Sequence, residues 1–204
     1  MQKIYFNEIG NEIGNEIGID EAGRGPLIGR VYAGAVIWPK DLECNLIKDS
    51  KKLSKKNRKK ALDWIKDNIP LWAVGYADNY EIDKYNILEA TKIAMQRALD
   101  NLKVDLNKYE IIIDGYGWCK KFPDYKVHSI IDGDNKYYSI AAASIIAKEY
   151  HDNYIIELCN NNVDFDNKYG LLKNMGYGTK KHMDGIKNYG ITEHHRKSFK
   201  PCQN

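Results

Sequence analysis

The chain has 204 residues, of which 43% are hydrophobic and 29% are charged, so it can fill one hydrophobic core and lacks the composition of a disordered protein. Its net charge of +3 does not by itself require a nucleic-acid partner. No apolar run approaches the roughly 20 residues that span a bilayer, and the chain does not open on a basic stretch with an apolar core, as a signal peptide would.

The four cysteines are scattered along the chain without a Cys-x-x-Cys pair, which argues against a zinc site or a disulfide framework. They are Cys44, Cys119, Cys159 and Cys202. Free thiols are typical of a reducing compartment. We therefore expect a soluble, cytoplasmic protein with no membrane partner, and we expect it to be a monomer.

The N-terminal segment contains a perfect tandem repeat, Asn-Glu-Ile-Gly, at residues 7–10, 11–14 and 15–18. Three four-residue copies are too short for a solenoid, whose repeats typically span about 20–50 residues. The repeat is either a ligand loop or partner tether, or an expansion of which the fold needs only the last copy. We divide the chain into an N-terminal extension, 1–17, and a single domain, 18–204.

Hydrophobic periodicity and turn residues predict alternating strands and helices after the repeat. Strands are predicted over 17–20, 31–38, 71–77, 109–113 and 125–131. Helices are predicted over 54–67 with Ser54 as N-cap, over 82–102, over a segment with apolar residues at steps of three and four from Ile140 to Leu158, and over 179–187 with Thr179 as N-cap. The polar, Gly-rich segment 160–178 is predicted to be a loop. This order of elements indicates a mixed α/β domain.

Positive charge is concentrated in two segments of the chain. The first run consists of Lys48, Lys51, Lys52, Lys55, Lys56, Arg58, Lys59 and Lys60, and the second of Lys180, Lys181, His182, Lys187, His194, His195, Arg196, Lys197 and Lys200. Each run alone is equally consistent with a solvated helix face and with phosphate contacts to a nucleic acid.

Four acidic residues lie where a buried element meets a loop. Asp20 and Glu21 end the first strand, Asp114 ends an apolar strand, and Asp134 precedes the long apolar helix. Ligands gather beyond the carboxyl ends of strands in α/β sheets, although an aspartate at a strand end often only caps the next loop. Neighbouring strand residues face opposite sides, so Asp20 and Glu21 can share a site only if the strand turns directly after them.

The chemistry of these four acids favours a divalent cation. Clustered carboxylates repel one another and would be mostly protonated without a cation. Hard oxygen ligands suit Mg²⁺ or Mn²⁺, and two such ions held about 4 Å apart clamp both the attacking and the leaving oxygen of a phosphodiester. The spacing of the acids thus indicates a metal-dependent nuclease without deciding for one.

Five segments, in order, resemble the motifs of the type 2 ribonuclease H (ribonuclease HII) family. They are residues 18–27 (D-E-A-G-R-G), 49–54 (D-S-K-K-L-S), 113–115 (the central acidic strand), 133–148 (the fourth acid and its helix) and 176–199 (the C-terminal signature). The resemblance covers residues 18–199, nearly the whole chain. One such motif would be weak evidence, whereas five in order are highly specific.

This resemblance implies an RNase H-like α/β fold: a five-stranded mixed sheet flanked by helices, with a C-terminal helical extension, so that 18–204 is a single catalytic domain. It also implies an endoribonuclease that hydrolyses the RNA strand of RNA–DNA hybrids and cuts 5′ of ribonucleotides embedded in duplex DNA. The implied mechanism is two-metal-ion catalysis with Mg²⁺ or Mn²⁺, which leaves 3′-OH and 5′-phosphate ends.

The site residues follow from the same resemblance. Asp20, Glu21, Asp114 and Asp134 are implied to be catalytic metal ligands. Gly23, Arg24 and Gly25 are implied to bind the ribose 2′-OH, largely through backbone groups, and Tyr177 to pack on the sugar 3′ of the ribonucleotide. Glycines let the backbone come close, and the 2′-OH separates RNA from DNA. The alternative for Tyr177, one of 15 tyrosines, is ordinary packing.

The chain departs from the family pattern at three positions. Met175 stands where lysine is usual, His151 where arginine is usual and Arg30 where proline is common. The four acids are intact, which argues against a non-catalytic hybrid-binding protein. The loop at 23–25 argues against a DNA-resolving or transposase-type nuclease, because DNA has no 2′-OH to bind. That loop, and the lack of room for a further N-terminal domain, argue against the sister type, ribonuclease HIII.

Overall fold

The computed structural model describes residues 16–39 and 42–203. The repeat copies at 7–10 and 11–14 lie outside this part of the chain. The first strand begins at Glu16, so the boundary expected between residues 17 and 18 falls inside that strand.

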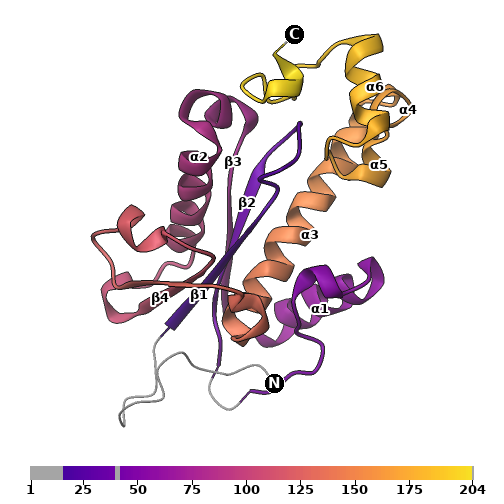
Figure 1. Ribbon diagram of the computed structural model, residues 1–204. Helices are drawn as coiled ribbons and strands as arrows, with labels where there is room; N and C mark the ends of the chain where they lie inside the picture. Colours follow the sequence, from indigo (N-terminus) through magenta and orange to yellow (C-terminus); the bar gives the residue numbers. More distant parts are fainter. Residues whose placement is uncertain (1–15, 40–41, 204) are drawn as a thin grey trace.

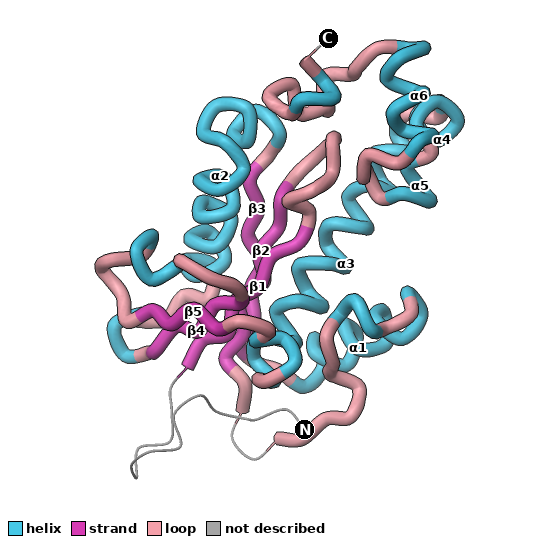
Figure 2. Tube along the Cα trace, in the orientation of Figure 1, coloured by secondary structure: helices cyan, strands magenta, loops and turns pink. Residues whose placement is uncertain are grey.

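Five strands form one mixed sheet (Figures 1 and 2). Their spatial order is β3, β2, β1, β4, β5, with β1 at Glu16–Ala22, β2 at Val31–Ile37, β3 at Leu71–Ala77, β4 at Glu110–Asp114 and β5 at Val127–Ile130. The central strand β1 pairs antiparallel with β2 and parallel with β4. The carboxyl ends of β1 and β4 therefore lie at the same edge of the sheet.

Helices cover both faces of this sheet, as predicted. They are α1 (Lys55–Asn68), α2 (Asn79–Asn101), α3 (Tyr138–Asn161), α4 (Asp164–Tyr169), α5 (Leu171–Asn174) and α6 (Lys180–Tyr189). Figure 1 shows α2 on one face, α3 and α1 on the other, and α4 to α6 as an extension beside the end of α3. A Cβ on Gly34 would collide with the backbone of Ala143 in α3, and a Cβ on Gly75 with the backbone of Ala94 in α2. The two glycines thus permit the close helix–sheet approach.

Two buried clusters fill the layers between sheet and helices. On the α2 side, Ile19 and Ile113 from neighbouring strands pack with Met95. On the α3 side, Val36 packs with Ile146 and with α1. Burying each such side chain contributes about 1.5–3 kcal/mol. The strand ends that carry the predicted acids are therefore held on a rigid, doubly covered sheet.

Local capping explains where the helices begin. Ser54 accepts a hydrogen bond from the Asn57 amide, and Thr179 caps α6 in the same way, as predicted. The second helix begins at Asn79 and not at residue 82, because Asp78 and Glu81 form a capping box.

The loop predicted over 160–178 is wrong, because this segment contains α4 and α5. Gly170, with φ of 68°, separates the two short helices. Tyr169 and Leu171 on either side of it are buried in the C-terminal cluster. Tertiary contacts hold these helices, and elements this short show no helical period in the sequence. Within the described residues, no helix is both long and apolar enough to cross a membrane.

Candidate metal centre and substrate pocket

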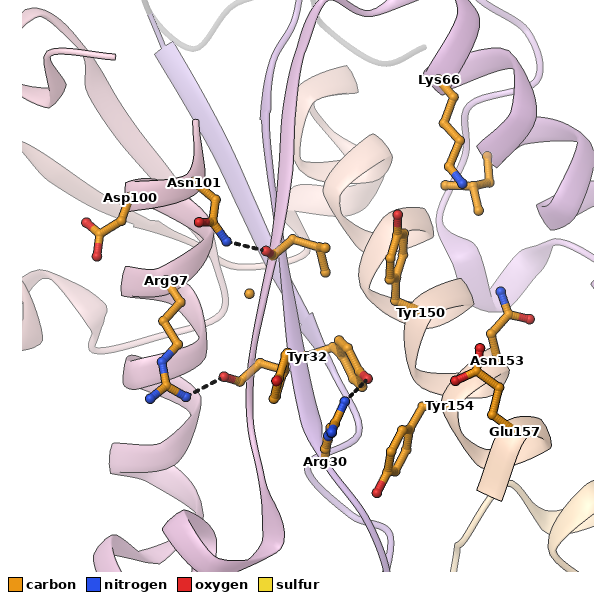
Figure 3. A pocket seen from close by; sticks show the side chains of 14 residues that line it. Arg30, Tyr32, Lys66, Arg97, Asp100, Asn101, Tyr150, Asn153, Tyr154 and Glu157 are labelled. Atoms are coloured by element: carbon orange, nitrogen blue, oxygen red, sulfur yellow. Dashed lines mark hydrogen bonds between the residues drawn. The ribbon is translucent and has the colours of Figure 1, made fainter. Parts of the chain in front are cut away.

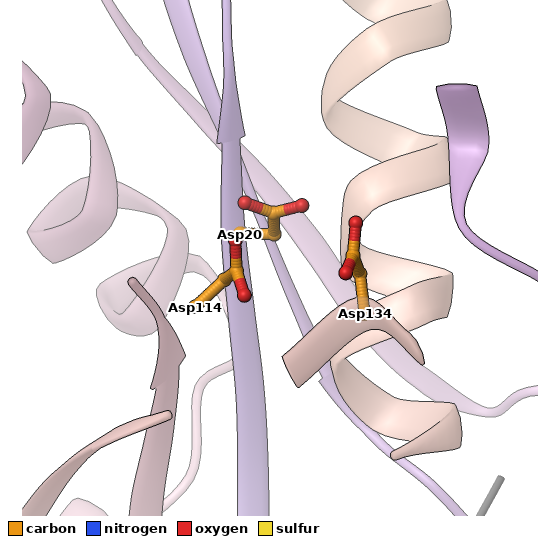
Figure 4. Close-up of side chains that lie close together, drawn as sticks. All are labelled: Asp20, Asp114 and Asp134. Atoms are coloured by element: carbon orange, nitrogen blue, oxygen red, sulfur yellow. The ribbon is translucent and has the colours of Figure 1, made fainter. Parts of the chain in front are cut away.

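The parallel pairing of β1 with β4 brings two of the predicted acids together. Ile19 is in register with Ile113, so the residues that follow, Asp20 and Asp114, stand at the same level. Asp134 comes from a single 3-10 turn just before α3. Each of the three aspartates offers a carboxylate oxygen, and these oxygens lie within 4.8 Å of one another (Figure 4).

Backbone amides hold two of these carboxylates in place. The Gly133 amide donates to Asp114 Oδ1 at 2.7 Å, which ties the end of β4 to the turn that carries Asp134. The Glu21 amide donates to Asp20 Oδ1, also at 2.7 Å. The remaining carboxylate oxygens are the hard donors that a small divalent cation prefers.

The electrostatics of the group also fit a cation. Burial raises the pKa of Asp20 well above its usual range, and the charges of Glu21 and Asp114 raise it further. Burial, followed by the charges of Asp114 and Asp49, raises the pKa of Asp134 to about 6. Neighbouring carboxylates with raised pKa values are difficult to ionise at the same time, and a bound cation would stabilise them as anions.

We expect the metal-free protein to lose stability between pH 5 and pH 7.5, and Asp134→Asn to reduce this loss. In the unfolded chain an aspartate has a pKa of about 3.9, so the folded state binds a proton more tightly and is favoured at low pH. That advantage disappears as the pH rises through the folded pKa of about 6. Melting temperatures in EDTA at both pH values test this. Parallel pH dependence in the two proteins would contradict it.

Glu21 lies beside the three aspartates and not within their group. The strand continues through Ala22 and turns only at Gly23, where φ is 90°. Glu21 Oε1 accepts a hydrogen bond from Arg24 at 3.0 Å. Its Oε2 is buried and has no hydrogen-bond partner among the described residues. A buried carboxylate oxygen without a donor is costly, and a bound cation would satisfy it, so the residues present fit the metal that the sequence predicts.

A cavity of about 240 Å³ opens next to the acids. It is lined by Glu21, Ala22, Gly23, Arg24, Gly25, Ser50, Lys51, Ser144, Lys148 and Tyr177. The cavity brings the glycine loop and Tyr177 together, although they lie far apart in the sequence. A Cβ on Gly25 would lie 3.0 Å from Cε1 of the Tyr177 ring. We call this cavity the substrate pocket, with the 23–25 loop and Tyr177 as facing walls.

Comparison with known proteins identifies the family. The model of the family "Ribonuclease HII" matches residues 17–202. The chain belongs to the ribonuclease HII family. A ribonuclease HII from Pelagibacter ubique is 47% identical over 186 residues, which is 90% of this chain and 94% of that protein. One from Rickettsia akari is 50% identical over 185 residues, which is 90% of each chain. The family predicted from the five motifs is confirmed, and the protein is a ribonuclease H.

Solved structures agree with this assignment. The ribonuclease H2 of Pyrococcus horikoshii superposes with a TM-score of 0.71 at 27% identity, covering 92% of this chain and 94% of that one. Bst-RNase HIII in complex with Mn²⁺ superposes with a TM-score of 0.69 at 21% identity, covering 94% of this chain and 70% of that one. The second likeness concerns the fold alone. The predicted RNase H-like fold is confirmed.

Five residues that line the pocket of this ribonuclease H were not predicted as site residues: Ala22, Ser50, Lys51, Ser144 and Lys148. Two of them, Lys51 and Ser144, interact with the acids. Burial lowers the pKa of Lys51, but the charges of Asp20 and Asp134 outweigh burial and raise it. Lys51 therefore faces the acidic group as its nearby positive charge. Ser144, on the first turns of α3, contributes a hydrogen bond that lowers the pKa of Asp20. The D-S-K-K-L-S motif contained the signal for Lys51, but counting it as part of a basic run concealed its place.

One member of the first basic run is buried and paired. Arg58 donates to Glu149 at 2.6 Å and to Asp152 at 2.8 Å. Asp152 also binds Lys148 at 2.7 Å and contacts His151. Arg58 is therefore a structural ion-pair partner and not a surface phosphate contact. Through Asp152 it supports Lys148, which lines the substrate pocket.

Arg30, a departure from the family pattern, belongs to a second cavity of about 660 Å³ at the β3 edge (Figure 3). Its guanidinium carbon lies 4.2 Å from the ring centroid of Tyr76 and 4.5 Å from that of Tyr154. It also donates to the Tyr32 hydroxyl at 3.4 Å. Cation–π contacts on two rings explain why arginine is accommodated here.

Proposed function

We propose that this ribonuclease H hydrolyses the RNA strand of RNA–DNA hybrids and cuts 5′ of ribonucleotides embedded in duplex DNA. The observation that carries this proposal is the group of three aspartates, together with a pocket lined by the neighbouring Glu21, the 23–25 loop and Tyr177. A ribonucleotide could thus place its scissile phosphate at the acids and its ribose in the adjacent pocket. The products would be a 3′-OH and a 5′-phosphate on the ribonucleotide.

The proposed cofactors are two Mg²⁺ or Mn²⁺ ions held by Asp20, Asp114 and Asp134, with Glu21 completing the ligand set. Bound there, such ions would activate a water molecule as the nucleophile and stabilise negative charge on the leaving oxygen. The buried, unbonded Oε2 of Glu21 supports its inclusion. Lys51, close to the same acids, would limit the net negative charge that the phosphate meets.

The loop at 23–25 is proposed to recognise the ribose. No hydrogen bond within the described part of the chain uses the backbone amides of Arg24 and Gly25, so both can bind a ligand. Gly25 lacks a side chain that would fill the space in front of Tyr177. A 2′-OH both donates and accepts hydrogen bonds, so backbone groups can bind it and exclude a deoxyribose.

Exposed lysines of the first basic run are proposed to bind the duplex backbone. Lys52, Lys55, Lys56, Lys59 and Lys60 are exposed along and before α1. Phosphate contacts of this kind position a duplex without selecting a sequence. The proposed partner is therefore an RNA–DNA hybrid or ribonucleotide-containing duplex. We further propose that the enzyme is cytoplasmic and monomeric.

We expect Arg24→Ala to reduce kcat/KM less than Gly23→Val. Gly23 has φ of 90°, and a Cβ there would collide with His151, so valine distorts the whole loop. Arg24 is exposed, and its guanidinium forms an ion pair with the carboxylate of Glu21 at 3.0 Å. Gly25→Ala separates recognition from folding, because its added Cβ meets only Tyr177. The measurements are kcat/KM and melting temperature. Greater damage from Arg24→Ala would assign ribose recognition to the guanidinium.

One cleavage assay tests the proposed function. The purified protein is incubated with Mg²⁺ or Mn²⁺ and with three duplexes: one with a single ribonucleotide, one continuous RNA–DNA hybrid and one of DNA alone. We expect the first two to be cut, with a nick 5′ of the single ribonucleotide. Binding without cleavage would favour a non-catalytic hybrid-binding protein. Cleavage of the all-DNA duplex would favour a DNA nuclease.

A further inference from the structure

The segment from Thr192 to Arg196 is hydrogen-bonded to both walls of the substrate pocket, to the 23–25 loop through Arg196 and to Tyr177 through His195 and His182. The guanidinium of Arg196 is fully buried. It donates to the carbonyls of Gly29 at 2.9 Å, Arg24 at 3.0 Å, Gly23 at 2.6 Å and Arg30 at 3.0 Å. The bonds to Gly23 and Arg24 turn carbonyls of the 23–25 loop toward the buried Arg196, and those to Gly29 and Arg30 tie the same guanidinium to the segment that leads into β2. Together they fix one wall of the pocket to residue 196.

His195, the preceding residue, connects the same backbone to the other wall. Its Nδ1 lies 2.9 Å from the Thr192 amide, and its Nε2 lies 3.1 Å from Nε2 of His182. The Nδ1 of His182 lies 3.1 Å from the Tyr177 carbonyl. Both imidazoles are buried. A continuous hydrogen-bonded path therefore runs from Thr192 through two rings to the backbone of Tyr177.

The fixed donors and acceptors at the two ends determine the protonation of both rings. The Thr192 amide can only donate, so Nδ1 of His195 accepts and its proton is on Nε2. The Thr192 hydroxyl also lies 2.9 Å from Nδ1 and is then a second donor to it. A backbone carbonyl can only accept, so His182 carries its proton on Nδ1. The Nε2–H of His195 then donates to the bare Nε2 of His182. A charge on either ring would place two N–H groups against each other or against the Thr192 amide.

The environment of the two rings agrees with neutral imidazoles. Burial lowers the pKa of His182, and burial with the neighbouring histidines lowers the pKa of His195 to about 3. Neither ring has a carboxylate among its partners in the described part of the chain. The two histidines therefore act as neutral hydrogen-bonding groups and add no positive charge, although both belong to the second basic run.

We propose that His182 and His195 are positioning residues that hold Tyr177 in register with the 23–25 loop and thereby set the width of the substrate pocket. They touch no substrate and act through the Tyr177 backbone. The adjacent Arg196 fixes the opposite wall, so the same segment, residues 192–196, holds both walls in place. This inference rests on the proposed role of the pocket in binding the ribonucleotide and the sugar beside it.

The protonation pattern is tested on the unmodified protein, without reference to activity. Long-range ¹H–¹⁵N correlation spectra of ¹⁵N-histidine-labelled protein at pH 7 identify the nitrogen that carries each proton. We expect the proton of His182 on Nδ1 and that of His195 on Nε2, with His182→Gln used to assign the signals. A proton on Nε2 of His182, or a charged ring, would overturn the proposal.

Two substitutions at residue 182 separate positioning from packing. The amide of asparagine lies near the position of Nδ1 and can still donate to the Tyr177 carbonyl, whereas the amide of glutamine lies near Nε2 and keeps only the contact with His195. On a duplex with a single ribonucleotide, we expect His182→Asn to stay within about threefold of wild type. We expect His182→Gln to lose about five- to tenfold in kcat/KM, the effect of one lost hydrogen bond.

A double-mutant cycle with Tyr177→Ala completes the test. If His182 acts through Tyr177, His182→Gln should cause no further loss in the Tyr177→Ala background. Equal losses from His182→Asn and His182→Gln, or additive losses in the cycle, would overturn the positioning role even if both variants fold. Failure of the wild-type protein to cleave any ribonucleotide duplex would instead contradict the proposed function.

Discussion

Asp114→Asn is expected to abolish cleavage while leaving the fold and most of the substrate binding intact. The Gly133 amide donates to Asp114 Oδ1 at 2.7 Å, and the asparagine oxygen can keep that bond. The substitution removes a negative charge that we propose binds a divalent cation together with Asp20 and Asp134. A metal ion contributes several kcal/mol of transition-state stabilisation, so we expect a loss of about a thousandfold or more in rate.

The measurements are kcat/KM on a single-ribonucleotide duplex, duplex affinity by fluorescence anisotropy, and the melting temperature without metal. The melting temperature should rise slightly, because Asp114 no longer repels Asp20. Asp132→Asn is the matched control. This exposed acid lies two residues before Asp134, has φ of 55°, which asparagine tolerates, and does not belong to the group of three. Cleavage near the wild-type rate by Asp114→Asn would remove Asp114 from the metal site.

The sequence correctly predicted where Asp20 and Asp114 lie in the sheet, because their positions depend on strand order. Asp20 and Asp114 each end an apolar strand, and parallel pairing of β1 with β4 places them side by side. The bounds of β3, 71–77, also match the prediction, because turn residues flank a strand of regular composition. Hydrophobic runs and turn residues sufficed to predict these strands, because the position of a strand depends on its local sequence.

The pocket could not be assembled from the sequence, because its walls meet only through tertiary packing. Lys51, Ser144 and Lys148 were visible as a basic run and an apolar helix, and nothing local placed them beside Glu21. The second basic run was interpreted by charge, yet Arg196 is buried against four carbonyls. Burial and hydrogen bonding decide what a cationic side chain does, and neither is a property of composition.

The exposed ring of Tyr177 forms one wall of the substrate pocket, and its removal should lower kcat/KM mainly on duplexes with a single ribonucleotide. The ring faces Gly25, and Lys148 Nζ lies 5.9 Å from its centroid. Its backbone is held by His182, so substituting the side chain leaves the turn anchored. A ring packed on a sugar acts through its face. Tyr177→Ala should therefore be damaging, whereas Tyr177→Phe should be nearly neutral.

We expect Tyr177→Ala to lower kcat/KM on a duplex with one ribonucleotide by about tenfold to a hundredfold, since an aromatic platform contributes about 1–3 kcal/mol. A continuous hybrid presents a ribose to the ring, gains little from it and should lose least. Tyr189→Ala, at another exposed tyrosine on α6, serves as the control and should match wild type. Equal losses for Tyr177→Ala on both substrates would make Tyr177 a general packing residue, because only a ring that contacts the deoxyribose beside a single ribonucleotide can distinguish the two duplexes.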